Sequence, residues 1–302
     1  MISRSKFRLK LRSQILILGP RTLVMGVLNV TPDSFSDGGN FLSQEKAVQH
    51  ALQMERDGAD LIDIGAESTR PGSLGISAEE EWSRLAPVLA ALRTRLKIPI
   101  SIDTRKGEVA AKGIESGAEI INDVSGLKHD PRIAEISARA RVPLILMHMR
   151  GEPQTMQQKP FAREPLKDVA HGLRASLSIA RKAGVPNSQI ILDPGIGFGK
   201  SYAQNYELLA KLPQLAKLGF PLLVGTSRKG FISKILAQDA KSPPSPRPAG
   251  AAAESRIWGT AATVTASILQ GAHIVRVHDV AEMVSVARVA DCILNPTLAP
   301  KN

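Results

Sequence analysis

The sequence predicts a single α/β domain with the architecture of an eight-stranded (β/α)8 TIM barrel. Eight short apolar runs alternate with longer amphipathic stretches along the 302 residues. The runs are almost continuously apolar, which is typical of parallel strands that are buried on both faces. A doubly wound dinucleotide-binding sheet would instead need a G-x-G-x-x-G turn after its first strand, and the sequence has none there. Eight βα units in one chain therefore favour the closed barrel.

Each expected strand is rich in aliphatic residues and ends near a polar residue. In chain order the strands are expected at 23–29, 59–65, 99–103, 119–124, 143–148, 189–195, 221–227 and 273–279. Apolar residues recur every three or four positions in the intervening stretches, for example 43–58, 77–96 and 164–184. This spacing predicts amphipathic helices, and the glycines that end several of them are typical C-caps.

The alternation of expected strands and helices is interrupted at 238–255, which is rich in Pro, Ser and Ala and has no apolar periodicity. We expect a long loop inserted into the seventh βα unit there. The barrel is predicted to span 22–294, between a basic extension over 1–21 and a tail over 295–302. The extension carries basic residues at nearly every second position and no acidic residue in its first twelve. These residues are Arg4, Lys6, Arg8, Lys10 and Arg12.

The composition excludes several classes of protein. The net charge of +11 raises the question of nucleic-acid binding, but aromatic residues make up only 4% of the chain, too few for a base-stacking platform. Cys292 is the only cysteine, so no internal disulfide can form. The sequence has neither an apolar run of about 20 residues nor a secretion signal. We expect a cytoplasmic protein that binds neither membrane nor nucleic acid, although the basic N-terminus leaves organelle targeting open.

Polar residues end nearly every expected strand. They are Asn29, the segment 67–70, Asp103, Asn122, Asp123, His148, Asp193, the segment 227–229, Arg276 and His278. In a barrel of this kind these positions meet at one end and form the active site. Any one of them could simply cap a helix. A whole ring is harder to explain in that way, because burying an unpaired polar group costs about 1–3 kcal/mol.

Three polar loops follow these strands. The segment 29–41 has turn chemistry around a lone Phe35, which we interpret as a lid for a bound ring, and 65–77 carries Arg70. The segment 193–201 is similar to a phosphate-binding loop, but Pro194 stands where that motif requires glycine. Its glycines are better explained by close passage of the backbone past a flat ligand held by Asp193. No zinc motif is present, whereas a magnesium ion carried largely by a substrate phosphate remains open.

Together these motifs resemble the dihydropteroate synthase family, the folate-pathway enzymes that sulfonamides inhibit. The resemblance covers about residues 22–290. It rests on MGVLNVTPDSFSDGG, DIGAESTRPGS, ISIDT, IINDVSG, LMHMRGEPQTMQ, ILDPGIGFGK, VGTSRKGFI and GAHIVRVHDV. The basic extension and the 238–255 insertion depart from the family pattern without touching a motif.

The resemblance implies a transferase that condenses 6-hydroxymethyl-7,8-dihydropterin diphosphate with 4-aminobenzoate to give 7,8-dihydropteroate and diphosphate. It implies a pterin pocket formed by Asp103, Asn122, Asp193 and Lys229 over a floor of Val124, Met147 and Phe198. Arg276 and His278 would bind the diphosphate, and Asn29 would ligate Mg²⁺. The 4-aminobenzoate pocket would be formed by Phe35, Ser68, Thr69, Arg70, Pro71 and Ser227. The residues expected in catalysis are Asp103, Lys229, Arg276 and His278, and the family likeness also implies a homodimer.

Two alternatives remain at this point. A pterin-dependent methyltransferase domain would share the Asp and Asn set for the pterin edge, but it would not need a diphosphate clamp. A non-catalytic barrel that binds anions or nucleic acid through its basic extension would tolerate changes at Asp193 and bind in a salt-dependent manner.

Overall fold

The computed structural model describes residues 4–31, 39–69, 72–157, 162–238 and 251–300. Eight parallel strands form one sheet in the order β8-β7-β6-β5-β4-β3-β10-β9. A parallel bridge between Leu192 and Leu222 links the two edges and closes the barrel. The strands are β3 (Leu23–Asn29), β4 (Leu61–Gly65), β5 (Ile100–Asp103), β6 (Ile120–Asp123), β7 (Leu144–Met147), β8 (Ile190–Asp193), β9 (Leu223–Val224) and β10 (Ile274–Val277). All eight expected strands are present, which confirms the predicted (β/α)8 barrel.

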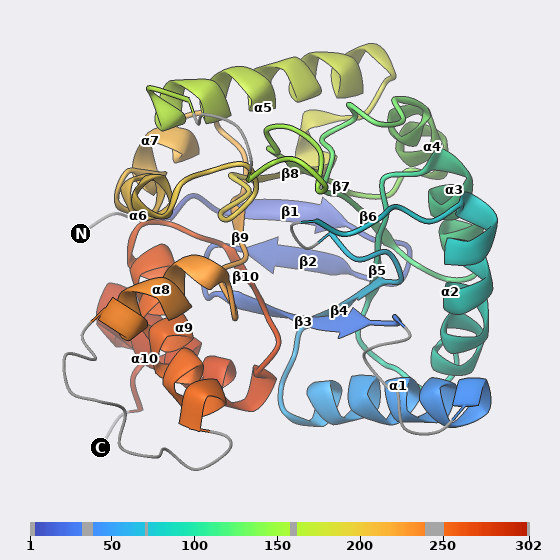
Figure 1. Cartoon of the computed structure of the whole chain (residues 1–302), viewed down its shortest axis with the longest axis horizontal. Helices are drawn as coiled ribbons and strands as arrows, with labels where there is room; N and C mark the ends of the chain where they lie inside the picture. Colours follow the sequence, from blue (N-terminus) through green and yellow to red (C-terminus); the bar gives the residue numbers. More distant parts are fainter. Residues whose placement is uncertain (1–3, 32–38, 70–71, 158–161, 239–250, 301–302) are drawn as a thin grey trace.

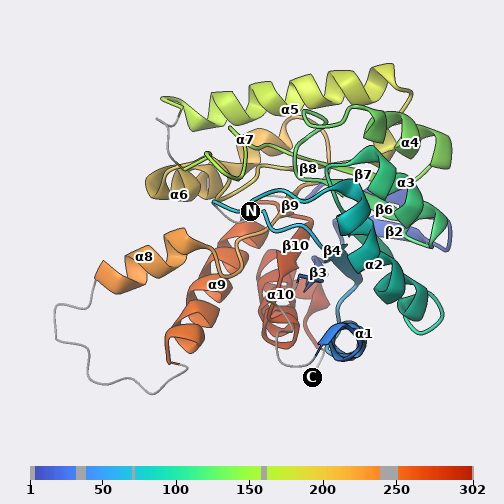
Figure 2. The same cartoon turned by 45° about the vertical axis from the view of Figure 1, so that its right-hand side comes forward.

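Helices surround the strands on all sides (Figures 1 and 2). In the described residues they are α1 (Gly39–Arg56), α2 (Ala78–Leu92), α3 (Gly107–Glu115), α4 (Arg132–Ala140), α5 (Pro165–Lys182), α6 (Tyr202–Ala210), α7 (Leu212–Ala216), α8 (Gly230–Gln238), α9 (Ala251–Leu269) and α10 (Val280–Leu294). Short 3₁₀ turns lie at Asn187–Gln189 and Pro296–Leu298. None of these helices, within the part of the chain that is described, combines the length and apolarity needed to cross a bilayer.

Two apolar layers hold the barrel together. The larger lies between the strands and the helices, where Ile62 and Ile64 of β4 belong to the same core as Leu85 and Leu89 of α2. The second fills the barrel interior at the amino ends of the strands. It contains Leu23, Met25, Leu61, Ile120, Ile145, Ile191, Leu223 and Ile274. This inner layer is the platform on which the polar end of the barrel rests.

The N-terminal segment corrects one expectation, because it is not a tail outside the barrel. Residues Phe7–Lys10 (β1) and Ile15–Leu18 (β2) pair as an antiparallel hairpin. The hairpin places Leu9, Leu11, Leu16 and Leu18 in the inner apolar layer and so covers the amino-terminal mouth of the barrel. Arg8 and Lys10 lie on the outward face of β1 and alternate with Leu9, so part of the basic alternation in the sequence was a strand signal.

Two basic residues of the N-terminal segment bond to other parts of the molecule. Arg4 is almost fully shielded and forms an ion pair of 2.6 Å with Asp291 of α10, and Arg12 donates to the carbonyl of Ile114 at 2.9 Å. The side-chain amide of Gln189 completes the edge of β1 by bonding to the backbone N–H and carbonyl of Lys10 at 3.0 and 2.7 Å. The extension is thus joined to the barrel by polar bonds as well as by apolar contacts.

The predicted loop at 238–255 is too long. Gln238 is still helical at the end of α8, and 251–255 already form the first residues of α9. That start is the run Ala-Ala-Ala-Glu-Ser, whose alanines have the highest helix propensity, and this overrides the absence of apolar periodicity. The remaining residues of the expected loop, 239–250, lie outside the described residues. The expected loop over 29–41 is likewise shorter, because α1 begins at Gly39.

Candidate active site

The candidate site is a polar layer immediately above the inner apolar layer. Side chains alternate along a strand, so the residue two positions after an inward apolar residue also faces the interior. On β4, β6, β8 and β10 that residue is Asp63, Asn122, Asp193 and Arg276, respectively. On β5 the corresponding strand-end residue is Asp103. Five polar side chains from five strands are therefore presented to the same end of the barrel.

Arg276 organises one side of this layer. Its Nε donates to Oδ2 of Asp63 at 2.6 Å, and its Nη2 donates to Oδ2 of Asp103 at 2.7 Å. The side-chain amide of Asn122 donates to the same Asp63 oxygen at 2.9 Å. Asp63 was not among the predicted site residues, although it bonds to two of them, Arg276 and Asn122. The period of two along β4 was the available signal, because it places Asp63 inward beside Asp103.

Burial and charge perturb this cluster. Burial raises the pKa of Asp103 to about 8, the neighbouring Asp63 carboxylate adds to the rise, and Arg276 opposes it. Burial alone would lower the pKa of Arg276, but the two carboxylates outweigh it and raise that pKa above its ordinary value. Arg276 is therefore a permanent cation shared between two buried acids. Among the described residues, no acceptor contacts its third nitrogen, Nη1.

Asp193 stands at the end of β8 and starts the glycine-rich loop. Its Oδ1 accepts the backbone N–H of Gly195 at 2.7 Å. Burial raises the pKa of Asp193, against the opposing effects of Lys229, that backbone bond and Lys200. Gly195 has φ +65°, and a Cβ there would lie 1.9 Å from the carbonyl oxygen of His148. Only glycine allows the chain to pass so close to the end of β7.

Lys200 stabilises the same loop from within. Its buried ammonium donates to the carbonyls of Gly195 at 2.8 Å, Phe198 at 2.9 Å and His148 at 3.2 Å. Burial lowers the pKa of Lys200 to about 7. The lysine that made this segment similar to a phosphate-binding loop thus binds the loop's own carbonyl groups.

Two of the strand-end residues have structural partners. Asp123 accepts the backbone N–H groups of Ser125 and Leu127 at 2.8 and 2.6 Å, which closes the turn after β6. Burial lowers the pKa of His148 to about 2, so its ring is neutral beside Lys200. For these two positions, a role in local structure accounts for the polar residue.

An apolar floor lies beside the carboxylates. Val124, Met147, Met149 and Met156 form a small buried cluster, and Phe198 packs against it. The ammonium of Lys229 lies 4.6 Å from the centre of the Phe198 ring and donates to the carbonyl of Ile196. Burial lowers the pKa of Lys229 to about 8, although Asp193 opposes that change. The predicted floor residues Val124, Met147 and Phe198 are therefore in one cluster, next to the predicted lysine.

Ser227 and His278 meet between β9 and β10. The Oγ of Ser227 lies 3.1 Å from Nδ1 of His278 and accepts the backbone N–H of the same histidine at 3.2 Å. Burial lowers the pKa of His278 to about 3, and the nearby Arg276 adds to this effect. The histidine is therefore neutral at pH 7, and Arg276 carries the positive charge of the pair.

The expected 4-aminobenzoate residues divide into two groups. Ser68 and Thr69 follow β4 and are half-buried, while Phe35, Arg70 and Pro71 lie outside the described residues. Glu67, just before them, is anchored by Arg105 and Lys106, which sequence reasoning did not single out. Their position directly after Asp103-Thr104 was the available signal, because it sets them at the same end of the barrel.

Asn29 ends β3, where it pairs with Gly65 of β4. Among the described residues, no group of three or more His, Cys, Asp or Glu could hold a metal ion. The amide oxygen of Asn29 is a hard ligand of the kind that Mg²⁺ accepts. Asn29 therefore offers one oxygen ligand of the type that suits magnesium.

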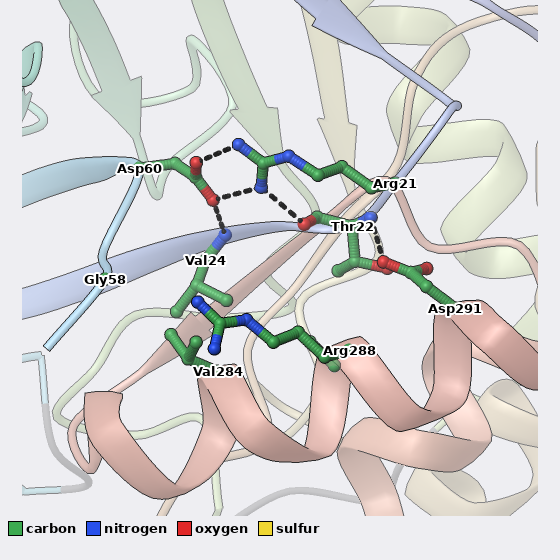
Figure 3. A pocket seen from close by; sticks show the side chains of 9 residues that line it. Arg21, Thr22, Val24, Gly58, Asp60, Val284, Arg288 and Asp291 are labelled. Atoms are coloured by element: carbon green, nitrogen blue, oxygen red, sulfur yellow. Dashed lines mark hydrogen bonds and ion pairs between the residues drawn. The ribbon is translucent and has the colours of Figure 1, made fainter. Parts of the chain in front are cut away.

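A separate cavity of about 320 Å³ lies at the opposite end of the barrel (Figure 3). It is lined by residues at the start of β3, residues that precede β4, and residues of α10. Four of its polar residues bond to one another: Arg21 donates to Asp60 at 2.9 Å, and the N–H of Thr22 donates to Asp291 at 2.6 Å. We assign no ligand to this cavity.

Comparison with known proteins agrees with this geometry. Residues 25–278 match the family described as pterin binding enzyme. A dihydropteroate synthase of Synechocystis sp. is 49% identical over 275 residues, 91% of either chain. The structure of Xanthomonas albilineans dihydropteroate synthase with 4-aminobenzoic acid superposes with a TM-score of 0.85 at 39% identity, covering 98% of this chain and 100% of that one. The same enzyme in complex with 7,8-dihydropteroate gives 0.81 at 38% identity, covering 97% and 100%.

The chain belongs to the dihydropteroate synthase family. This confirms the expected family, the expected barrel fold and the expected enzyme class. The alternative of a pterin-dependent methyltransferase domain is not favoured, because the relatives from Synechocystis sp. and Bacillus subtilis and the similar solved structure from Xanthomonas albilineans are dihydropteroate synthases. Another structural relative, from Yersinia pestis, is a complex with a sulfonamide drug, in keeping with the expected drug-target class.

Proposed function

We propose that this chain condenses 6-hydroxymethyl-7,8-dihydropterin diphosphate with 4-aminobenzoate, releasing diphosphate and forming 7,8-dihydropteroate. The observation that carries the proposal is the polar layer at the carboxyl ends of the strands. Its carboxylates, amide and cations lie directly beside an apolar floor. A flat heterocycle with a hydrogen-bonding edge and a charged substituent needs this combination of surfaces.

In this proposal the pterin lies on Val124, Met147 and Phe198, with its polar edge toward Asp193 and Asn122. Asp193 accepts from the N–H donors of the pyrimidine edge, and Asn122 can both donate and accept. Lys229 donates to the ring carbonyl and the adjacent ring nitrogen. Its place 4.6 Å from the Phe198 ring supports this role, because a ligand lying on that ring would come within reach of the ammonium.

The diphosphate is bound by Arg276 and His278. Arg276 can offer Nη1 without breaking its bonds to Asp63 and Asp103, and neutral His278 can donate from its ring. Asn29 would hold a magnesium ion together with the phosphate oxygens. When bound, Mg²⁺ would neutralise negative charge on the leaving diphosphate.

The reaction breaks the bond between the pterin methylene carbon and the diphosphate oxygen, and the electron pair leaves with diphosphate. The dihydropterin ring delocalises the positive charge that develops on the methylene carbon. Asp103 lies at this end of the barrel, where its ionised carboxylate would stabilise that charge. The amine lone pair of 4-aminobenzoate then forms the new carbon–nitrogen bond, and the nitrogen releases a proton. Ser68, Thr69 and Ser227 are proposed to bind the aryl acid, together with Phe35, Arg70 and Pro71.

We further propose that the enzyme is a cytoplasmic homodimer. Trp258 on α9 is 69% exposed, and Val289 and Ile293 on α10 are 64% and 54% exposed. Val289 and Ile293 are four residues apart on one helix face, and α9 packs against α10. A second copy of the chain would bury these apolar side chains.

The direct test is to mix purified protein with Mg²⁺, the pterin diphosphate and 4-aminobenzoate and to measure dihydropteroate and diphosphate by chromatography. We expect both products in equal amounts. Asp193→Asn should lower pterin affinity about tenfold or more, because the loss of a hydrogen bond to a charged group costs about 1.5–3 kcal/mol. Asp57→Asn at the end of α1 is the matched control and should behave as wild type. A folded wild-type chain that forms no dihydropteroate, or that transfers a methyl group from methyltetrahydrofolate instead, would refute the proposal.

A further inference from the structure

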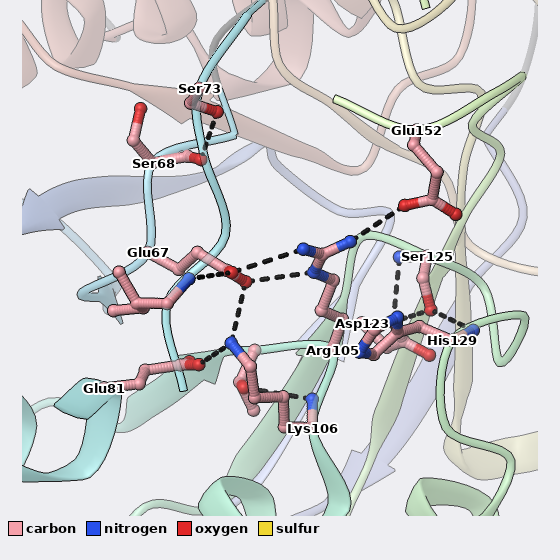
Figure 4. A network of polar contacts seen from close by, with 12 residues as sticks. Glu67, Ser68, Ser73, Glu81, Arg105, Lys106, Asp123, Ser125, His129 and Glu152 are labelled. Carbon is pink, nitrogen blue, oxygen red and sulfur yellow. Dashed lines mark hydrogen bonds and ion pairs between the residues drawn. The ribbon is translucent and has the colours of Figure 1, made fainter. Parts of the chain in front are cut away.

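A network of charged side chains lies at the base of the segment that carries Ser68 and Thr69 (Figure 4). Its centre is Glu67, whose carboxylate accepts from Nε and Nη2 of Arg105 at 3.0 and 3.2 Å and lies 3.0 Å from the ammonium of Lys106. Lys106 also donates to Glu81 of α2 at 2.5 Å. The other arm of Arg105 donates to Glu152 at 2.9 Å.

The centre of this network is shielded from solvent, whereas Glu152 on its outer arm is 60% exposed. The side chains of Glu67, Arg105 and Lys106 are 5%, 12% and 13% exposed, and that of Glu81 is fully buried. Burial alone would raise the pKa of Glu67, but the bonds from Arg105 and Lys106 outweigh it and hold the pKa below its ordinary value. Glu67 is therefore an anion fixed between two cations. Such paired, partly buried charges define geometry more strictly than surface ion pairs do.

The network joins three barrel loops. Glu67 lies after β4, Arg105 after β5 and Glu152 after β7. Glu67 also accepts the backbone N–H of Ile76 at 3.2 Å, so its carboxylate bridges the two ends of the 67–76 segment. A backbone bond of 3.0 Å from Gly72 to Pro153 connects this segment to the loop after β7 a second time.

We propose that Arg105 is a positioning residue for the aryl acceptor: through Glu67 and Glu152 it fixes the backbone that presents Ser68 and Thr69. The inference rests on the proposed function, because it assumes that these two residues bind 4-aminobenzoate. Arg105 acts through Glu67 and does not touch the substrate. Its forked guanidinium donates from Nε and Nη2 to Glu67 and from Nη1 to Glu152, so it holds two carboxylates on different loops in one planar geometry.

The test is steady-state kinetics of the full chain with each substrate varied in turn. Arg105→Ala should raise the KM for 4-aminobenzoate about tenfold or more and leave the KM for the pterin diphosphate within about twofold, since a misplacement of about 1 Å can cost up to about 100-fold. Arg105→Lys should recover part of the loss. Glu152→Gln, which removes only the outer arm, should give a smaller change in the same direction. Arg132→Ala is the matched control, because Arg132 is 74% exposed and pairs with Asp130 instead of with Glu67 or Glu152.

Arg105 is the appropriate residue to change because Lys106 still pairs with Glu67 in its absence. Removing Lys106 would instead leave fully buried Glu81 without its partner and endanger the fold. A thermal melt of each variant separates the two effects. Equal increases of both KM values, or a lowered melting temperature with both KM values unchanged, would show that Arg105 only supports the fold and would overturn the inference.

Calorimetry keeps this test independent of turnover. Titration of 4-aminobenzoate into wild type and Arg105→Ala, both with Mg²⁺ and diphosphate present, should show weaker binding to the variant by the same factor. Equal binding would overturn the inference even if the wild type is active. If the wild type makes no dihydropteroate, it is the proposed function that fails, and the titration still reports on Arg105.

Discussion

At the scale of the residue, the unusual feature is a buried carboxylate that serves two site residues. Asp63 is completely shielded, and its Oδ2 accepts from both Arg276 and Asn122. Within the described residues its second oxygen, Oδ1, has no partner. Arg276 is held by Asp63 and Asp103 at its Nε and Nη2, which orients Nη1 without using it. A rigidly held guanidinium loses less conformational entropy on binding phosphate than a free one does.

Lys229 gives a pH-dependent prediction at the same scale. Burial lowers its pKa to about 8, below the ordinary value of 10.5, so ligand-free enzyme loses this proton as pH rises through about 8. If the pterin binds the ammonium form, affinity should be constant below about pH 8 and should fall as much as about tenfold per pH unit above it. The measurement is the pterin dissociation constant between pH 6.5 and 9.5.

A variant separates this effect from that of Asp103, whose pKa is also raised to about 8 and which ionises over the same range. Lys229→Met should bind the pterin more weakly at pH 7 and should show no loss above pH 8 beyond what Asp103 contributes. Identical pH profiles for wild type and Lys229→Met would exclude Lys229 as the titrating donor.

At the scale of the element, the N-terminal hairpin covers and closes the amino-terminal end of the barrel. Inward-facing Leu16 and Leu18 of β2 join the inner apolar layer, whereas Ile15 and Ile17 of the same strand are 46% and 42% exposed. The alternation follows from the period of two along a strand. The polar layer of the active site lies on the other face of that apolar layer. The hairpin therefore stabilises the platform beneath the site without contacting the site itself.

Leu18→Ala should therefore destabilise the fold and leave the kinetics unchanged. Removing a fully buried leucine costs about 2–5 kcal/mol, whereas Ile17→Ala on the exposed face of the same strand should change the free energy of unfolding by less than about 1 kcal/mol. Urea unfolding of both variants and of wild type provides the measurement. Equal midpoints for the two variants would show that the hairpin is not part of the cooperative core.

At the scale of the whole molecule, charge and apolar surface are unevenly distributed. The chain has a net charge of +11, but Arg4 and Arg12 are bonded to other parts of the barrel. Within the described residues the basic N-terminus is thus joined to the barrel, while Lys6, Arg8 and Lys10 remain exposed. The apolar side chains on α9 and α10 remain as the surface to be explained by association.

Sedimentation velocity tests the proposed homodimer. Wild type should sediment as a dimer of 32.4 kDa chains, and Trp258→Glu should shift the population toward monomer, because a charge would have to be buried at the interface. Ile15→Glu on the hairpin is the matched control and should remain dimeric. Dissociation by Ile15→Glu alone would move the interface to the amino-terminal end of the barrel.

The sequence by itself determined the strands, their closure into a barrel, the family and the end of the barrel that carries polar residues. These properties are encoded locally: the period of two fixes which residues face inward, and runs of motif residues stay contiguous in the chain. Only the tertiary structure decided that Arg276 bonds to Asp63, 213 positions away, that Arg105 joins Glu67 to Glu152, and that the basic N-terminus folds beneath the barrel. The local sequence around a charged residue does not indicate which distant residue it will pair with. The partner is chosen by which strands lie side by side after the barrel closes and by the cost of leaving a buried charge unpaired.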